Sequence, residues 1–162
     1  MIDPQIFATD KSELYRELAQ ALSAVVAGEP DDIANMANVA ALLWEYLPDI
    51  NWAGFYRAVG DELVLGPFQG RAACVRIPFG KGVCGTAASS RTTQVVEDVH
   101  AFPGHIACDA ASRSEIVVPI IRDGQVIAVL DIDSPVIGRF DAVDRAGCEA
   151  IAAIVSENRA QS

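Results

Sequence analysis

Three of the four cysteines lie in short segments whose neighbours suit thiol chemistry. Cys108 lies beside an aspartate and three residues after a histidine, Cys84 follows a lysine flanked by glycines, and Cys74 lies two residues before Arg76. A cysteine near a cation or at a helix N-terminus is partly ionised, and the thiolate is its reactive form. Together these thiols predict redox chemistry, although any one of them would also suit a buried core position.

The fourth cysteine and the N-terminus set the redox context. Cys148 falls beside the apolar stripe of a predicted final helix, so we predict a packed core thiol there. The first residues show no basic region followed by an apolar run, which predicts a cytoplasmic protein. In a reducing compartment lasting disulfides are rare, and those that form are usually catalytic or redox-sensing.

Composition excludes several classes of protein. The 162 residues, of which 51% are hydrophobic and 21% charged, predict one domain over residues 1–162 with an adequate core. A formal net charge of −10 disfavours binding to nucleic acid or to anionic membranes, which requires clustered Lys and Arg. Apolar stretches fall short of the ~20 residues of a membrane span. We therefore expect neither nucleic acid nor a membrane as a partner.

The chain shows no local motif for a metal or a nucleotide. His100, His105 and the cysteines could supply metal ligands, but no Cys-x-x-Cys or paired His-Cys spacing typical of structural zinc is present. Residues 80–82 lack the pattern that cradles a nucleotide phosphate, and are expected to form a hinge or turn. The prediction is an apoprotein without a bound metal or cofactor.

Two carboxylates end an otherwise apolar strand. Asp131 and Asp133 lie on the same strand face, and burying them is costly unless a cation or hydrogen-bond donors meet them. A bound ammonium group would satisfy them, and exposure to solvent at the strand end suits the pattern equally well. Glu115 can join them only through a β-bulge, because a strict two-residue turn at residues 123–124 pairs Ser114 with Asp133.

Trp52 and Tyr56 complete the set of candidate site residues. They share a strand face, with Gly54 between them. We expect the missing side chain at Gly54 to leave room for a small apolar group against the two rings. Aromatic strand residues are also common in cores, which is the alternative interpretation.

The elements that must position these residues predict an α+β domain. Residues 98–114 form a long irregular stretch, where function is most expected. A short helix is expected to begin near Cys84, and Pro67 indicates a strand edge or bulge. The remaining periodicities predict helices over 11–27, 33–47 and 141–158, and strands over 52–57, 63–69, 74–77, 94–97, 116–121 and 126–133.

Four segments taken together resemble the free methionine-(R)-sulfoxide reductases, which are built on a GAF domain. They are residues 51–56, 82–87, 105–109 and 129–135, and the resemblance covers nearly the whole chain. It implies a GAF-like domain whose central antiparallel sheet has about six strands with helices packed against it. It leaves both a monomer and a homodimer open.

The resemblance also implies a role for each candidate residue. Cys108 would be the nucleophile and Cys74 the resolving cysteine, while Cys84 would be a second resolving thiol or, in a competing assignment, the attacking one. Trp52 and Tyr56 would hold the methyl group and side chain of the substrate. Three acidic residues, Glu115, Asp131 and Asp133, would bind the ammonium group of the substrate and assist proton transfer.

The implied reaction needs no bound cofactor. The Cys108 thiolate attacks the sulfoxide sulfur of free methionine sulfoxide while a carboxylic acid protonates the oxygen, giving a sulfenic acid and methionine. A second cysteine condenses with the sulfenic acid to a disulfide, which thioredoxin or a similar dithiol reduces. The alternatives are a non-enzymatic GAF sensor and a redox-sensing thiol switch. Sensors usually accompany an output domain, for which 162 residues leave no room, so we favour the enzyme.

Overall fold

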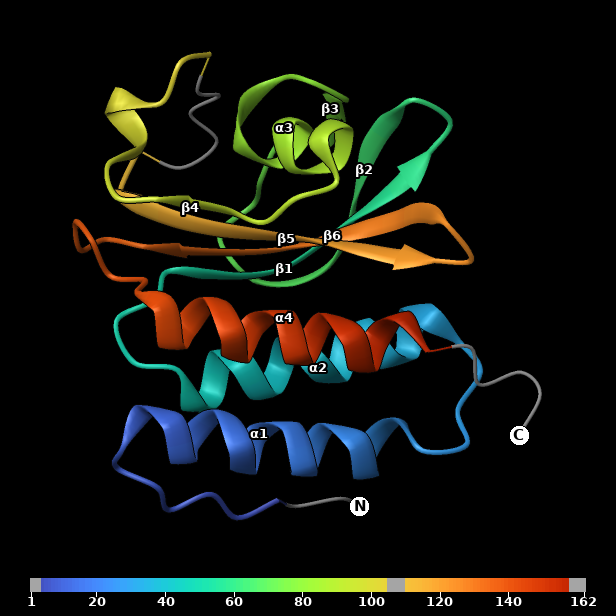
Figure 1. The fold of residues 1–162 in the computed structure, drawn as a ribbon, viewed down its shortest axis with the longest axis vertical. Helices are drawn as coiled ribbons and strands as arrows, with labels where there is room; N and C mark the ends of the chain where they lie inside the picture. Colours follow the sequence, from blue (N-terminus) through green and yellow to red (C-terminus); the bar gives the residue numbers. More distant parts are fainter. Residues whose placement is uncertain (1–3, 105–109, 158–162) are drawn as a thin grey trace.

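The fold is a six-stranded antiparallel sheet with helices on both faces. The computed structural model describes residues 4–104 and 110–157, and the strands follow the order β3-β2-β1-β6-β5-β4 (Figure 1). This confirms the α+β class and the sheet of about six strands. The elements in chain order are α1 (Lys11–Val26), α2 (Asp32–Tyr46), β1 (Trp52–Val59), β2 (Glu62–Gly70), β3 (Arg76–Pro78), α3 (Gly82–Ser90), β4 (Gln94–Val96), a 3₁₀ turn (Val99–Ala101), β5 (Ser114–Arg122), β6 (Gln125–Ser134) and α4 (Ala142–Ser156).

Aspartate caps start three of the helices. The side chain of Asp10 accepts a hydrogen bond from the backbone N–H of Glu13 at 3.2 Å, and Asp31 accepts from Ala34 at 3.0 Å. Asp141 caps α4 in a capping box. Each cap satisfies backbone donors that the first helical turn leaves open, so these helices begin near the positions that the sequence predicts.

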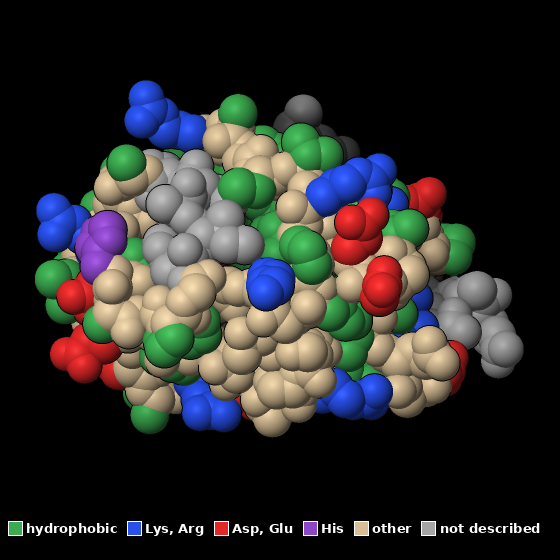
Figure 2. All heavy atoms as spheres, turned by 90° about the horizontal axis from the view of Figure 1, so that it is seen from above, with side chains coloured by type: hydrophobic (Ala, Val, Ile, Leu, Met, Phe, Trp, Pro, Cys, Tyr) green, Lys and Arg blue, Asp and Glu red, His purple; other side chains and the backbone are tan. Residues whose placement is uncertain are grey.

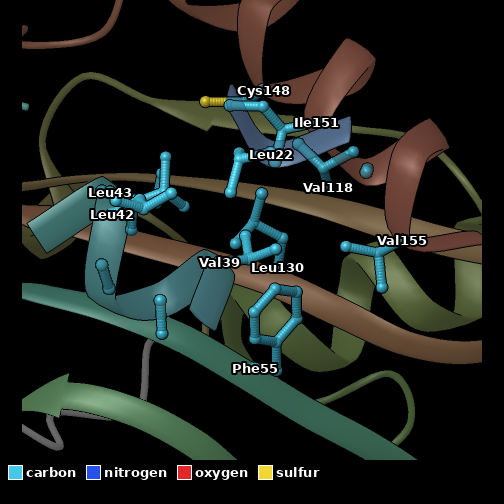
Figure 3. Packing of buried hydrophobic residues seen from close by; sticks show 14 of the residues in the cluster. Leu22, Val39, Leu42, Leu43, Phe55, Val118, Leu130, Cys148, Ile151 and Val155 are labelled. Atoms are coloured by element: carbon cyan, nitrogen blue, oxygen red, sulfur yellow. The ribbon is translucent and has the colours of Figure 1, made fainter. Parts of the chain in front are cut away.

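The main core lies between the sheet and the helices α2 and α4. Alternate strand residues such as Phe55, Val118 and Leu130 point into it, and side chains of the helices close around them (Figure 3). Helix α1 packs on the outer side of α2 and α4, so the sheet and three helices form three layers (Figure 1). The prediction for Cys148 is confirmed: its side chain is 0% exposed, and burial raises its pKa to about 12.

The opposite face of the sheet carries a smaller core under α3. Trp52, Tyr56 and Val129 project from the strands toward Val83 and Ala87 of α3. Period-two alternation explains the division, because neighbouring residues of one strand face opposite sides of the sheet. The candidate site residues of β1 and β6 therefore lie on the α3 side.

Two β-bulges adjust which residues face one another. Gly54 of β1 pairs with Phe68 of β2, but Tyr56 pairs with Leu65. Strand β2 therefore carries an extra residue near Pro67, where the sequence predicts a strand edge or bulge. Between β5 and β6, Ile120 pairs with Ala128 while Ile121 pairs with Val126, which leaves Ile127 as an extra residue on β6. This shift of one residue places Glu115 opposite Asp133.

Some predicted bounds differ from those of the structure. The short third strand is Arg76–Pro78 rather than residues 74–77, so Cys74 lies in the preceding loop and does not share a strand face with Arg76. The turn expected at residues 80–82 is present, with positive φ at Gly80 and Gly82. Within the described parts of the chain, no helix is both long and apolar enough to cross a membrane.

Candidate active site

A cavity of about 40 Å³ lies between the sheet, the start of α3 and the loop before β3. Side chains on β1, β5 and β6 form its floor. Among the predicted site residues in the described parts of the chain, all but Cys74 line this cavity. Ala73, the neighbour of Cys74, also lines it. The predicted residues in the lining are Trp52, Tyr56, Cys84, Glu115, Asp131 and Asp133.

The three carboxylates meet on the α3 side of the sheet. Asp133 pairs with Trp52 on one side and with Glu115 on the other, and Asp131 lies two residues along the same strand. Glu115 is 7% exposed and Asp131 is 5% exposed, whereas Asp133 is half-buried. Exposure to solvent at the strand end is therefore wrong for Asp131. Its Oδ1 atom is buried without a hydrogen-bond partner.

Burial and mutual repulsion keep protons on this cluster. Burial raises the pKa of Asp131 to about 8, and the charge of Asp133 acts in the same direction. The pKa of Glu115 is also raised well above its usual value, first by burial and then by the charge of Asp131. A carboxyl group that stays protonated at neutral pH can act as a general acid.

Cys84 lies in the first turn of α3 and points at the acidic cluster. Its thiol is 5% exposed and donates to Glu115 Oε2 at 3.9 Å. Burial, followed by the charges of Asp131, Glu115 and Asp133, raises its pKa well above the usual value. The expectation that the helix start favours a thiolate at Cys84 is therefore wrong, because desolvation and three acidic neighbours outweigh the helix dipole.

Trp52 and Tyr56 attach the loop before β3 to the sheet. The indole Nε1 of Trp52 donates to the carbonyl oxygen of Arg71 at 3.1 Å, and the hydroxyl of Tyr56 donates to that of Cys74 at 3.1 Å. The two rings are stacked with centroids 5.8 Å apart. The aromatic pair thus forms one wall of the cavity and also positions the loop that carries Cys74.

The space beside Gly54 is filled by the protein itself rather than left open for a substrate group. A Cβ atom at this position would lie 2.3 Å from the Cβ of Phe68, so neighbouring strand β2 fills the gap. The ring of Phe68 stacks on Trp52 with centroids 5.1 Å apart. The expectation of room for a substrate group is therefore wrong, because the bulge in β2 brings its backbone against Gly54.

The cysteines in the described parts of the chain differ in their covalent state. Cys74 is disulfide-bonded and half-buried, whereas Cys84 and Cys148 are free. Cys108, His105 and Asp109 lie outside the described residues. Arg76, expected near Cys74, forms an ion pair with Glu62 of β2 at 2.6 Å.

Several lining residues were not identified from the sequence. Ser112 is buried, accepts a hydrogen bond from the amide Nδ2 of Asn51 at 3.2 Å and lines the cavity four positions after Cys108. Arg71 and Lys81 also line it. Loop residues of this kind carry no periodic signal, although Asn51 opens one of the segments behind the family resemblance.

Seen from the α3 side, the acidic side chains of the described residues are dispersed over the surface. Figure 2 shows acidic side chains of the described residues in small groups among basic, apolar and polar ones. The carboxylates of Glu115 and Asp131 are buried beneath this face. The charge of the site therefore acts inside the cavity, where a low dielectric strengthens it.

Comparison with known proteins gives the family. A sequence model of the GAF domain matches residues 34–158. The free methionine-R-sulfoxide reductase of Escherichia coli (strain K12) is 56% identical over 144 residues, which are 89% of this chain and 87% of that protein. The chain belongs to the free methionine-(R)-sulfoxide reductases, within the GAF-domain family.

A solved reductase structure and a second curated relative match most of the chain. The X-ray structure of free methionine-R-sulfoxide reductase from Neisseria meningitidis in complex with its substrate is 48% identical, with a TM-score of 0.94. The match covers 98% of this chain and 96% of that one. The reductase from Saccharomyces cerevisiae is 45% identical over 157 residues, which are 92% of this chain and 87% of that protein.

Proposed function

We propose that this reductase converts free L-methionine (R)-sulfoxide to L-methionine within a single catalytic domain spanning residues 1–162. The observation that carries the proposal is the cavity in which buried carboxylates adjoin an aromatic wall. Asp131 Oδ1 has no hydrogen-bond partner there, and a buried polar atom without one is costly. A substrate ammonium would remove that cost.

The free amino acid fits the two halves of the cavity. Its ammonium group binds to Glu115, Asp131 and Asp133, and its sulfur substituents pack against Trp52 and Tyr56. A methionine sulfoxide inside a peptide offers an amide in place of the ammonium, so the carboxylates would stay without a cation. It also brings flanking chain, which a closed pocket between the sheet, α3 and the loop before β3 cannot house.

The chemistry combines a thiolate with a protonated carboxyl group. The Cys108 thiolate attacks the sulfoxide sulfur while Glu115 or Asp133 donates a proton to the oxygen; the S–O bond of the substrate breaks and a sulfenic acid forms on Cys108. The two electrons that reduce the sulfoxide come from Cys108. The raised pKa of Glu115 supports the proton-donor role of this cluster.

Cys74 is proposed to resolve the sulfenic acid. Its thiol attacks Cys108, water leaves, and a disulfide remains for thioredoxin or a similar dithiol to reduce. The disulfide-bonded state of Cys74 supports this assignment. The loop is half-buried at Cys74, and the next side chain, Val75, is 61% exposed, so a reductant could reach it. Such recycling fits the cytoplasm, where thioredoxin keeps thiols reduced.

Cys84 is proposed to assist rather than attack. Its raised pKa and its contact with Glu115 suit a protonated thiol next to the acidic cluster. A buried neutral thiol is a poor nucleophile. This favours Cys108 over the competing assignment in which Cys84 attacks first.

The test is turnover on free and blocked substrates. Purified protein is incubated with dithiothreitol and either diastereomer of free methionine sulfoxide, or with the N-acetylated, C-amidated (R)-sulfoxide, and methionine or its blocked form is measured. We expect turnover of the free (R)-sulfoxide and a rate lower by ~10⁴ or more on the blocked compound. The variant Cys148→Ser serves as a control for the loss of a buried thiol.

The possible results separate the alternatives. Absence of turnover on every compound would favour a sensor or a thiol switch over an enzyme. Comparable rates on the free and blocked substrates would refute ammonium recognition even though reductase activity was present.

A further inference from the structure

The cavity brings together a thiol and two carboxylates from three different elements. One donor atom each from Cys84, Glu115 and Asp131 lies within 4.8 Å of the other two, and all three residues are buried. Cys84 comes from α3, Glu115 from β5 and Asp131 from β6. We refer to these three residues as the thiol-carboxylate triad.

The spacing of the triad approaches that of metal ligands. In a tetrahedral zinc site a sulfur and an oxygen ligand lie about 3.5 Å apart, given bond lengths near 2.3 and 2.0 Å. The Cys84 Sγ and Glu115 Oε2 atoms are 3.9 Å apart. The other pairs of donor atoms lie within 4.8 Å, so side-chain rotations must bring the three donors closer when an ion binds.

A second observation points to a missing ligand. Asp131 Oδ1 has no hydrogen-bond partner although the residue is only 5% exposed and lines the cavity. Among the described ion pairs, none involves Glu115 or Asp131. The ion pairs of the described lysines and arginines thus leave the donor atoms of the triad available to a cation.

We propose that the thiol-carboxylate triad binds a thiophilic divalent cation such as Zn²⁺ when the substrate is absent. Binding releases to solvent the proton of Cys84 and the protons that Glu115 and Asp131 hold, so that a thiolate and two carboxylates coordinate the ion. The fourth position faces the cavity. Because the proposed function places the substrate ammonium on Glu115 and Asp131, the cation and the substrate compete, and the cation inhibits the enzyme reversibly.

The backbone holds the three donors in place. Gly85 accepts a hydrogen bond at its carbonyl oxygen from Gly80 N–H at 2.8 Å, and a Cβ at Gly85 would lie 2.5 Å from the carbonyl oxygen of Pro78. This close contact fixes the first turn of α3, which carries Cys84. On the sheet, Asp131 pairs with Val117, two residues from Glu115. Such preorganisation favours binding because little freedom remains to be lost.

The binding experiment uses Cd²⁺ as the probe, because a thiolate bound to Cd²⁺ gives an ultraviolet charge-transfer band. The protein is the double variant Cys74→Ser, Cys108→Ser, in which Cys84 and Cys148 are the remaining cysteines. We expect one Cd²⁺ per chain, a band with the intensity of one thiolate, proton release into a weak buffer, and displacement by Zn²⁺. The absence of a band would overturn the proposal.

A matched pair of variants assigns the band. Adding Cys84→Ser should abolish it, and adding Cys148→Ser, which removes the other buried free thiol, should leave it unchanged. The reverse pattern would overturn the proposal. If the Cys84→Ser protein does not fold, Asp131→Asn replaces it: we expect Cd²⁺ affinity to fall at least about tenfold, and unchanged affinity would refute the site.

Competition with the substrate separates this inference from the proposed function. The double variant lacks Cys108 and cannot consume methionine sulfoxide, which should therefore shift the Cd²⁺ titration to higher concentration. A Cys84-dependent band that the substrate does not shift would support the metal site and refute the proposed position of the ammonium. Substrate binding without a Cd²⁺ band would support that position and overturn the metal site.

Discussion

Replacing Asp131 by asparagine should make the protein more stable at neutral pH and a poorer enzyme. The carboxyl is 5% exposed, one oxygen has no partner, and its pKa is raised to about 8 from an ordinary 3.8. Between pH 3.8 and about pH 8, the Asp131 carboxyl therefore holds a proton in the folded state that it has released in the unfolded chain. Stability from this group is complete below pH 4 and is lost as pH rises toward 8.

The size of the effect follows from linkage. At pH 7 the two pKa values correspond to about 4 kcal/mol of stability lost relative to a side chain that does not titrate. Roughly 2 to 3 kcal/mol of that loss occurs between pH 5 and pH 7. The raised pKa of Glu115 acts in the same direction. Asparagine has nearly the same shape and no proton to lose, so it should remove most of this loss.

The assay is urea unfolding of wild type and Asp131→Asn at pH 4, 5 and 7. We expect similar stability at pH 4 and a variant that is more stable by several kcal/mol at pH 7. In contrast, kcat/KM on free methionine sulfoxide should fall by roughly 10² or more, because a charged contact to the ammonium is lost. Activity and stability would thus move in opposite directions.

Asp144→Asn is the matched control. This aspartate is 0% exposed but is paired with Arg139 at 3.1 Å and with Lys11 at 2.9 Å, and it accepts from the Tyr15 hydroxyl. Breaking a buried pair of this kind usually costs about 3 to 5 kcal/mol, so the same substitution should destabilise here. An Asp131→Asn protein that is less stable than wild type at pH 7, or whose pH dependence is unchanged, would refute the reasoning.

Three further predictions concern the thiols and the aromatic wall. Cys108→Ser should abolish steady-state turnover, because an alcohol is far less ionised than a thiol; normal activity would exclude Cys108 as nucleophile. Cys74→Ser should release about one methionine per chain in a single turnover but recycle poorly with thioredoxin. If Cys84→Ser has that phenotype instead, Cys84 is the resolving thiol. Gly54→Ala should cost about 1 to 3 kcal/mol in urea unfolding, because the new Cβ would lie 2.3 Å from the Cβ of Phe68, and an unchanged midpoint would contradict this.

Local patterns were enough to predict most of the fold. Helical periodicity located the long helices to within about two residues, since this signal depends only on neighbours in the chain. Alternation placed Trp52 and Tyr56 on one strand face and Asp131 with Asp133 on another. The element order then indicated an α+β domain, and the four motif segments indicated the reductase family.

Only the tertiary structure decided how these parts form a site. A single extra residue, Ile127, sets whether Glu115 faces Asp133, and nothing in the sequence of β6 marks it as a bulge. Cys84 has a helix start as its sequence neighbour, but its burial in the fold, followed by the charges of three carboxylates nearby, reverses the expected shift of its pKa. Gly54 accommodates Phe68 because the bulge in β2 brings that strand against it. In each case the deciding contact joins residues far apart in the chain, where burial and register control the electrostatics and packing.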